Sequence, residues 1–412
     1  TIAAGANLNI TGPVSLGRRI DNFGTTTWTG TGNINTSGGG ASVVFDNKAG
    51  GQFLIQNDQT IQGDGGGAEV VINAGLLRKT VASGTTTLAG VVDFNNTGGT
   101  LDMQTGVLSF GSTFNPSGAS SLTAGTLNVT AGGSGTGTFS TSAGSTVSFS
   151  GGTYTVAGGA SIASGSLLAV NGGTLTSTGS ITTSNLDLSS GTLNGAGTVT
   201  VNNTMNWSSG AQGNNAGTTT IAAGANLNIT GPVSLGRRID NFGTTTWTGA
   251  GNINTSGGGA SVVFDNKVGG QFLIQNDQTI QGDGGGTEVV INSGLLRKTV
   301  ATGTTTLAGA VDLTNAAGAT LEVQTGTLQI DSLSGGSNSG TIDIAAAATL
   351  ATNGAALVNA ASGIIRGSGM LNLAGATLTN DGTISPGVGA GNTATLGITG
   401  NLVNTGSIEI EL

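Results

Sequence analysis

The chain has 412 residues, 78 of them Gly, with only 8% charged residues and a formal net charge of −9. The absence of His and Cys excludes imidazole catalysis, His-based triads, thiol chemistry and thiolate metal sites. The scarcity of basic residues argues against binding nucleic acid through its phosphates, and no apolar run is long enough for a membrane span or a helix bundle. A mean hydropathy of +0.16 is too apolar for a disordered linker, so we expect the chain to fold.

The N-terminal part of the chain carries a recurring motif: an apolar residue, any residue, Asn, any residue, Gly. Its Asn falls at Asn22, Asn47, Asn73 and Asn96, in steps of 25, 26 and 23 residues. The segment "FNPSG" at 114–118 follows about one step later, with Pro116 near the Asn position. Because Asn and Gly both tolerate positive φ, and because stacked Asn side chains can hydrogen-bond to each other, the motif predicts corners of a stacked structure.

The middle of the chain shows a shorter rhythm, in which Gly or Asn introduces Thr or Ser and then alternating apolar residues. The leading apolar residues run from Val147 to Met205 in nine steps of about 6.4 residues. Alternation over four or five residues bounded by Gly predicts short, half-buried strands. About three such strands fit each Asn interval, so the sequence predicts an all-β, single-stranded parallel β-helix (β-solenoid) of roughly 18–19 coils of 21–26 residues, with three short strands per coil.

The C-terminal half repeats the N-terminal block. Residues 1–93 recur as 220–312 with six differences, a period of about 219. The Asn positions of this half are Asn241, Asn266, Asn292, Asn315, Asn338, Asn359, Asn380 and Asn404. Residues 345–361 have a helix-like composition, but they keep the Asn interval, so we expect strands there too. We predict one continuous β-solenoid over 1–412, with 331–412 as its C-terminal coils.

Several stretches carry a family resemblance: "GTTTWTG" (24–30), "VDFNNTGGTLDMQTGVL" (92–108), "LTNDGTISPG" (378–387) and "TLGITGNLVNTGSIEIEL" (395–412). They resemble the repeats of bacterial autotransporter passenger domains and filamentous-haemagglutinin-type adhesins, over nearly the whole chain. The resemblance implies a bacterial protein that is secreted or displayed at the cell surface and is adhesive or structural, as in extracellular fibres and biofilm matrix. Its implied partners are cell-surface glycans or other copies of itself, without nucleic acid and without direct membrane insertion of this segment. Because the chain starts within the repeat, we expect it to be a fragment without its targeting parts.

Few residues qualify as ligand-binding candidates, and we expect no catalytic, cofactor-binding or metal-binding residue. Trp28 and Trp247 could stack on a sugar ring, although alternation favours core packing for both. Asp46 and Asp265 lie beside corner Asn residues and could bind a cation or sugar hydroxyls together with Asp21, Asp93, Asp240 and Asp312, although solvation and turn hydrogen bonds explain them more simply.

Further charged residues have simple structural interpretations. "QGDGGG", with Asp64 and Asp283 and the nearby Glu69 and Glu288, faintly resembles a calcium repeat but supplies one acid per copy and fits a corner loop better. The basic pairs are expected to be solvated side chains or small anion contacts, and they are Arg18–Arg19, Arg78–Lys79, Arg237–Arg238 and Arg297–Lys298.

The expected function is that of a non-enzymatic extracellular rod, a segment of a larger repetitive adhesin or fibre. One alternative is a self-assembling filament subunit whose terminal coils, including "SIEIEL" at 407–412, pair end to end. Another is a β-helical polysaccharide-active enzyme that uses Asp46 or Asp265. An ice-binding solenoid is disfavoured because the Thr triplets, at 25–27, 85–87, 218–220, 244–246 and 304–306, are too sparse.

Overall fold

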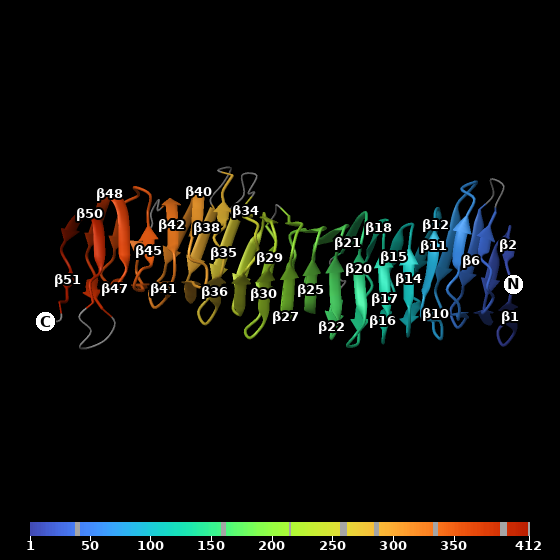
Figure 1. Ribbon diagram of the computed structural model, residues 1–412. Coiled ribbons are helices and arrows are strands. Elements are labelled where there is room, and N and C mark those ends of the chain that lie inside the picture. Colours follow the sequence, from blue (N-terminus) through green and yellow to red (C-terminus); the bar gives the residue numbers. More distant parts are fainter. Residues whose placement is uncertain are drawn as a thin grey trace. The chain divides into compact units, whose positions relative to one another are not determined.

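The structure is a computed structural model that describes the chain except for residues 38–41, 158–161, 214–215, 256–261, 284–287, 333–336, 388–393 and 411–412. The described residues form short parallel strands and no helix, stacked coil upon coil as a β-solenoid of about 17 turns (Figure 1). The predicted fold class is therefore confirmed. The number of turns is slightly lower than expected because corner loops lengthen some coils; Thr25 and its register partner Gln52, for example, are 27 residues apart.

The coils group into two compact units, unit 1 (Thr1–Thr200) and unit 2 (Val201–Leu412). Each unit has three faces, and every coil contributes one short strand to each face. The expectation that 1–412 forms one continuous solenoid stays a prediction.

Unit 1 has faces A, B and C, each a ladder of parallel strands. Face A contains β1 (Asn7–Ile10), β4 (Thr25–Trp28), β7 (Gln52–Ile55), β10 (Leu76–Lys79), β13 (Thr100–Met103), β16 (Ser120–Leu122), β19 (Phe139–Thr141) and β22 (Ile162–Ser164). Face B contains β2 (Val14–Leu16), β5 (Ile34–Thr36), β8 (Thr60–Gly63), β11 (Thr85–Ala89), β14 (Val107–Phe110), β17 (Thr126–Val129), β20 (Thr146–Phe149), β23 (Leu167–Val170) and β25 (Ile181–Leu188). Face C contains β3 (Ile20–Asn22), β6 (Val43–Asn47), β9 (Glu69–Asn73), β12 (Val92–Asn96), β15 (Phe114–Pro116), β18 (Gly132–Gly135), β21 (Thr153–Val156), β24 (Thr174–Ser177) and β26 (Thr192–Asn194).

Unit 2 has faces D, E and F, and several of its strands bend around a corner to join two faces. Face D contains β29 (Thr218–Ile221), β32 (Arg238–Asn241), β35 (Val262–Asn266), β38 (Glu288–Asn292), β40 (Thr304–Asn315), β43 (Ser337–Asn338), β46 (Leu357–Asn359), β48 (Met370–Asn380) and β50 (Gly397–Asn404). Face E contains the end of β27 (Thr198–Trp207), then β30 (Asn226–Ile229), β33 (Thr244–Trp247), β36 (Gln271–Ile274), β39 (Leu295–Lys298), β41 (Thr320–Val323), β44 (Thr341–Ile344), β47 (Ile364–Gly367), β49 (Thr383–Pro386) and β51 (Ser407–Ile408). Face F contains β28 (Ala211–Gln212), β31 (Val233–Leu235), β34 (Ile253–Thr255), β37 (Thr279–Gln281), β42 (Thr327–Ser332), β45 (Thr349–Ala351) and the first parts of β40, β48 and β50.

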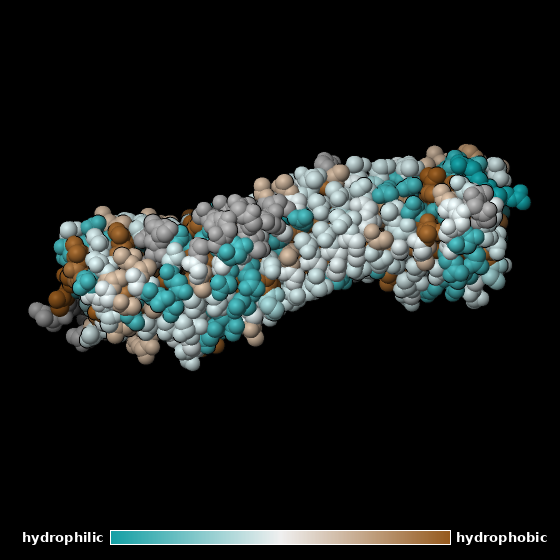
Figure 2. Space-filling view, turned by 90° about the horizontal axis from the view of Figure 1, so that it is seen from above, coloured by the Kyte–Doolittle hydropathy of each residue, from teal (hydrophilic) through white to brown (hydrophobic). Residues whose placement is uncertain are grey.

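The core of each unit is the interior of its coils. Strand alternation turns every second side chain inward, because successive Cβ atoms point to opposite faces of a sheet. In unit 1, the rings of Phe110 and Phe114 pack with their centroids 4.5 Å apart and their planes tilted by 33°, and the ring of Phe94 lies 4.9 Å from that of Phe110. On the face shown in Figure 2, hydrophobic atoms appear only in small groups, because the apolar side chains of each coil are buried against the next coil.

The Gly of the recurring motif is required by the close approach of stacked coils. A Cβ on Gly75 would lie 2.2 Å from the carbonyl oxygen of Gly51 one coil earlier, and a Cβ on Gly294 would lie 2.2 Å from that of Gly270. Neither of these glycines has a positive φ, and none of the corner Asn residues does either. The explanation from positive φ is therefore wrong for the corner Asn residues and for these two glycines, where the stack needs the missing side chain. It holds for the motif glycine Gly98, whose φ is 81°.

Candidate functional site

The corner Asn side chains of unit 1 form a hydrogen-bonded ladder. The Nδ2 of each Asn donates to the Oδ1 of the Asn in the next coil, over 2.8 Å from Asn22 to Asn47, 2.8 Å from Asn47 to Asn73 and 2.7 Å from Asn73 to Asn96. All four side chains are buried. The ladder ends where Pro116 takes the register position after Asn96, and Asn96 donates instead to the carbonyl oxygen of Gly99 at 2.9 Å.

Unit 2 holds a longer ladder of the same kind, which runs through all eight predicted positions. Its bonds join Asn241–Asn266, Asn266–Asn292, Asn292–Asn315, Asn315–Asn338, Asn338–Asn359, Asn359–Asn380 and Asn380–Asn404, with distances of 2.6–2.8 Å. Several Nδ2 groups also donate to a backbone carbonyl, as Asn292 does to Thr320 at 2.9 Å. The predicted asparagine ladder is confirmed within each unit.

Each ladder begins at an unsatisfied acceptor. The Oδ1 atoms of Asn22 and Asn241 are buried, and no donor among the described residues reaches them. The preceding coil places Ile2 next to Asn22 and Ile221 next to Asn241 in register. An aliphatic side chain at that position cannot donate a hydrogen bond, so the buried carbonyl carries a desolvation cost.

The candidates Asp46 and Asp265 each lie in a four-residue charge network on the outside of two adjacent coils. The Asp46 carboxylate accepts from Arg19 and, at 2.6 Å, from Lys48, and Arg19 also bonds Asp21 at 2.8 Å. Asp21 and Asp46 are register partners on β3 and β6. The hydrogen bond from Arg19 holds the pKa of Asp21 below its ordinary value, and the bond to Asp46 raises the pKa of Lys48.

The second copy repeats this network. Arg238 bonds Asp240 at 2.6 Å and also bonds Asp265, while Lys267 bonds Asp265 at 2.6 Å. Two carboxylates and two cations are therefore paired with each other in each copy. Asp46 and Asp265 are buried, with side chains 6% and 8% exposed, so loss of their cations would leave a buried carboxylate without a partner.

Asp93 and Asp312, which the sequence groups with these acids, lie apart from them. Asp93 pairs in register with Val70, whereas Asp46 pairs with Ile72. Burial acts to raise the pKa of Asp93, but hydrogen bonds from Ser112 and Thr113 outweigh it and hold that pKa below its ordinary value. Asp312 likewise accepts a hydrogen bond from Ser332, at 2.6 Å.

Trp28 and Trp247 are in the interior, each with no exposed surface. The indole nitrogen of Trp28 donates to the carbonyl oxygen of Gly32 at 3.3 Å, and its ring stacks against Phe53 with centroids 6.5 Å apart. Stacking on a sugar needs an exposed ring face, which neither Trp presents in this structure.

The Thr triplets are only partly on the surface. The middle Thr of each triplet is buried, namely Thr26, Thr86, Thr219, Thr245 and Thr305. Each triplet therefore supplies at most two outward Thr side chains, fewer than the sequence suggests.

Lys79 and Lys298, which the sequence analysis expects to be solvated, are fully buried. The ammonium group of Lys79 donates to the carbonyl oxygen of Asn57, to Asp58 Oδ1 and to Thr86 Oγ1, each at 2.9 Å. Lys298 makes the same contacts with Asn276, Asp277 and Thr305 at 2.9–3.0 Å. The solvated interpretation was wrong because Lys79 continues the inward alternation of Leu77 on β10 and finds two of its three acceptors on the previous coil. The sequence does carry a signal for this burial, because each lysine stands two positions after an inward Leu and therefore points to the same side of the strand.

Arg237 and its copy Arg18 occupy different surroundings. Arg237 is fully buried and donates to the carbonyl oxygen of Thr218 at 3.1 Å. Burial lowers the pKa of Arg237 to about 10. Arg18 is exposed because it lies in the first coil, which has no coil before it in this structure.

The "QGDGGG" corner is closed by a buried glutamate. Glu69 accepts from Thr36 Oγ1 at 2.7 Å and from the backbone N–H of Asp64 at 3.2 Å. In the second copy Glu288 accepts from the N–H of Asp283 at 3.1 Å, while part of the corner, 284–287, lies outside the described residues. Burial raises the pKa of Glu288, and hydrogen bonding with Asp283 adds to it. Among the described residues no cluster of three or more acids has a geometry that could hold a metal ion.

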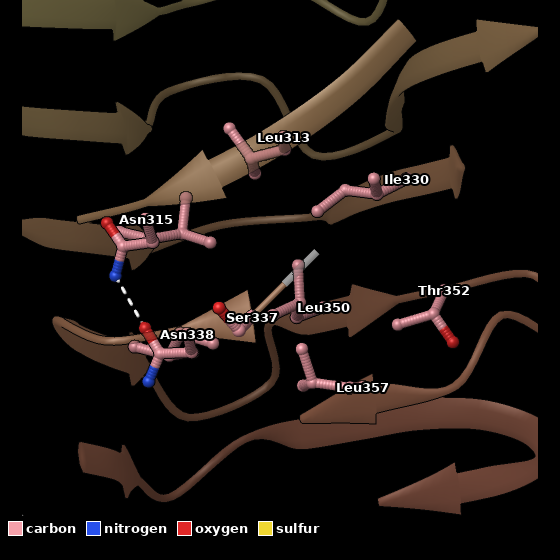
Figure 3. A pocket seen from close by; sticks show the side chains of 10 residues that line it. Leu313, Asn315, Ile330, Ser337, Asn338, Leu350, Thr352 and Leu357 are labelled. Carbon is pink, nitrogen blue, oxygen red and sulfur yellow. Dashed lines mark hydrogen bonds between the residues drawn. The ribbon is translucent and has the colours of Figure 1, made fainter. Parts of the chain in front are cut away.

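Unit 2 encloses a small internal cavity of about 20 Å³ (Figure 3). Leu313, Ile330 and Leu350 line it, together with Asn315 and Asn338 of the ladder. A space of this size holds about one water molecule. It is a packing defect between coils rather than a pocket for a substrate.

The described part of the chain contains no helix with the length and hydrophobicity needed to cross a membrane. No protein-family model matches the chain, and a search of curated protein sequences returns no match either. The autotransporter and haemagglutinin resemblance consequently gains no support from these comparisons, whereas a β-helical repeat architecture agrees with the structure.

Proposed function

We propose that this chain is a non-enzymatic structural and adhesive segment of a larger extracellular bacterial repeat protein. The observation that carries the proposal is the reproduction of the same contacts between coils in both copies of the duplicated block. The Asn22–Asn47 bond and its copy Asn241–Asn266 are both 2.8 Å long. Because each coil in a repeat architecture contacts only its neighbours, such a block can be copied to lengthen a protein without redesigning it.

The hydrogen-bond partners of the candidate acids Asp46 and Asp265 also support a role without catalysis. Hydrolysis of a glycosidic bond uses two carboxyl groups on opposite sides of the bond, one of which must hold a proton. Asp46 and Asp265 each accept hydrogen bonds from an Arg and a Lys, so both carboxylates are already paired with cations of the chain itself. This pairing suits an ion network between adjacent coils better than a general acid.

The extracellular and adhesive parts of the proposal rest on the resemblance to bacterial exoproteins and on the absence of Cys. A chain without Cys forms no premature disulfides during export. Cell-surface glycans are the proposed ligands, because an almost uncharged surface rich in Thr, Ser and Asn offers many hydroxyl and amide groups to sugars.

The proposal can be tested with the purified chain on a panel of polysaccharides. We expect no release of reducing sugars from the wild type, retention on a subset of immobilised glycans, and unchanged retention for the double variant Asp46→Asn/Asp265→Asn. Release of reducing sugars that disappears in the double variant would establish an enzyme and overturn the proposal. Digestion of intact source cells with an external protease should remove the protein; protection from the protease would contradict the extracellular location.

A further inference from the structure

Phe23 and its copy Phe242 are the two aromatic side chains that the described part of the chain leaves in solvent. Each is 42% exposed, whereas the other Phe residues, the three Trp residues and the single Tyr are buried. Burial of an aromatic ring is favourable. An exposed ring at the same place in both copies of the block therefore points to a contact with something outside the coil.

The exposure of Phe242 does not depend on the ends of the chain. Phe242 follows β32, which pairs in register with β29 on the preceding coil and with β35 on the following coil. Phe23 follows β3 and has the same exposed fraction, although less of the chain precedes it. Further coils before or after the chain would leave both rings exposed, because each ring lies at an outer corner.

Strand alternation directs the Phe242 ring outward. Ile239 and Asn241 on β32 are buried. Successive side chains of a strand point to opposite sides, so Arg238, Asp240 and Phe242 point away from the interior. An aromatic ring and two charged side chains therefore lie on the same side of this corner.

The backbone on both sides of the ring is held against the preceding coil. The N–H of Phe242 donates to the carbonyl oxygen of Ile221 at 2.9 Å. A Cβ on Gly243 would lie 2.1 Å from the carbonyl oxygen of Ala225, so this part of the corner is in close contact with that coil. A ligand would meet a ring on a fixed backbone, which lowers the entropy lost on binding.

A lysine stands opposite the ring on the next coil. Asn241 and Asn266 are register partners, and the N–H of Lys267 donates to the carbonyl oxygen of Asn241 at 2.9 Å. Lys267 directly follows Asn266 as Phe242 follows Asn241, so the lysine and the ring occupy matching corner positions of adjacent coils.

The charged side chains beside the ring offer both donors and acceptors. Asp240 bonds Arg238 at 2.6 Å and Lys267 at 3.2 Å, and the three side chains are 20%, 35% and 25% exposed, in that order. Asp265 is only 8% exposed and supports the two cations from beneath. We call the outward set Arg238, Asp240, Phe242 and Lys267 the Phe242 corner, and its copy, Arg19, Asp21, Phe23 and Lys48, the Phe23 corner.

This combination of groups matches the chemistry of a sugar ring. A pyranose has an apolar C–H face that packs on an aromatic ring, and hydroxyl groups that both donate and accept hydrogen bonds. Each corner holds two cations together with two carboxylates, counting the buried Asp265 or Asp46, so its charge is balanced and it favours neither anionic nor cationic ligands. Two equivalent sites in one chain suit a ligand made of repeating units, because simultaneous binding raises the apparent affinity.

We propose that the Phe242 corner and the Phe23 corner bind a neutral polysaccharide, with each Phe ring packed on the C–H face of one sugar and the exposed charged side chains bonded to its hydroxyl groups. This inference rests on the glycan binding proposed above and assigns that binding to a site. Asp46 and Asp265 lie beneath the contact surface and are spared by the ligand, in agreement with the unchanged retention expected for the Asp46→Asn/Asp265→Asn variant.

The test is native electrophoresis of the full chain through gels that contain mannan, dextran or galactan as neutral polysaccharides, or alginate or chitosan as charged ones. We expect at least one neutral polysaccharide to retard the wild type. Phe23→Ala/Phe242→Ala should raise the apparent Kd about tenfold or more. Phe23→Tyr/Phe242→Tyr keeps both rings and should be retarded like the wild type, while each single Ala variant should lie between the wild type and the double variant.

A matched control removes exposed apolar groups at other corners. Val81 and Val300 are 75% and 68% exposed, one in each copy, and Val81→Ala/Val300→Ala should be retarded like the wild type. All variants should keep the wild-type circular dichroism, because every altered side chain is on the surface.

The outcomes separate this site from the broader proposal. If a neutral polysaccharide retards the wild type and the double Phe→Ala variant equally, the site is wrong and glycan binding still holds. An equal loss in the Val control, or retardation by alginate or chitosan alone, would also overturn the assignment. If no polysaccharide retards the wild type, both this inference and the proposed glycan ligands fail.

Discussion

The side-chain amide of Asn266 donates a 2.8 Å hydrogen bond to the side-chain oxygen of Asn292 one coil further along, and both residues are completely buried. Within a ladder each Asn is both donor and acceptor, so a polar group that would be costly to bury is satisfied by its own repeat. The ladder therefore fixes the register of successive coils while leaving the rest of the interior apolar.

Loss of one Asn in the middle of the ladder should be costly. Asn292→Ala removes the acceptor of Asn266 and the donor of Asn315, and it leaves both partners buried. We expect a loss of about 2–4 kcal/mol in the free energy of unfolding, because each unsatisfied buried group costs about 1–3 kcal/mol. Chemical denaturation followed by circular dichroism measures this loss.

The end of the same ladder provides the control. Asn404 is exposed; it accepts from Asn380 and donates only to the nearby carbonyl oxygen of Gly406, at 3.2 Å. Asn404→Ala should therefore cost less than about 1 kcal/mol. Equal losses for the two variants would show that the buried ladder does not stabilise the stack.

The start of the ladder can be extended. Ile221→Asn would place a donor beside the unsatisfied Oδ1 of Asn241. Ile221→Ala should cost about 2–5 kcal/mol through lost burial and the cavity it leaves. The Asn variant should be more stable than the Ala variant, because the new hydrogen bond offsets part of that loss. Thermal unfolding shows which of the two variants is more stable. If the Asn variant is no more stable than the Ala variant, the proposed extension of the ladder is wrong.

The spacing between coils should make one glycine irreplaceable and its copy replaceable. Gly231→Ala would force a methyl group to within 2.1 Å of a backbone oxygen, so we expect a loss of about 1–3 kcal/mol or more. Gly12→Ala meets open space and should change the monomer by less than about 0.5 kcal/mol. Comparison of the two unfolding curves tests this directly, and similar losses would contradict the assigned spacing between coils.

Stability should depend on pH through Glu288. Its pKa lies above the ordinary value of 4.5, chiefly because of burial. The folded state therefore binds the proton more tightly than the unfolded chain, so this contribution is fully present below pH 4.5 and is lost as the pH rises through the folded-state pKa. Glu288→Gln stays neutral and should flatten the fall in the free energy of unfolding as the pH rises above 4.5. If the free energy of unfolding changes with pH equally in the wild type and the variant, Glu288 is not the group responsible.

The backbone architecture could be predicted because it follows from spacing alone. The Asn interval and the alternation of inward residues depend on local sequence, and the same residues, such as Asn241 and Asn266, meet in the structure as predicted. The two copies of the duplicated block make the same ladder bonds, as Asn47–Asn73 and Asn266–Asn292 do at 2.8 Å.

The surroundings of individual charged residues were harder to predict, because they depend on which residues of the previous coil lie opposite. Lys79 is buried because the Asn57 carbonyl and Asp58 lie within reach on that coil, and neither is near it in sequence. The separation of Asp93 from the Asp46 network was readable, since Asp46 directly precedes its corner Asn and Asp93 lies three residues before its own. The difference between Arg18 and Arg237 could not be read, because their local sequences are identical.

The stacking of coils in register is the claim on which the rest depends, and a disulfide between neighbouring coils tests it most directly. The chain has no Cys, so an introduced pair provides the only two thiols. Thr246 and Leu273 are register partners on β33 and β36, and Leu273 is in turn the partner of Arg297 on β39. Neighbouring parallel strands lie about 4.8 Å apart, within disulfide range, whereas strands two coils apart lie about 9.6 Å apart, beyond it. The account predicts that Thr246→Cys/Leu273→Cys closes a disulfide on mild oxidation and that Thr246→Cys/Arg297→Cys does not; the reverse result, or equal yields for both pairs, would contradict it.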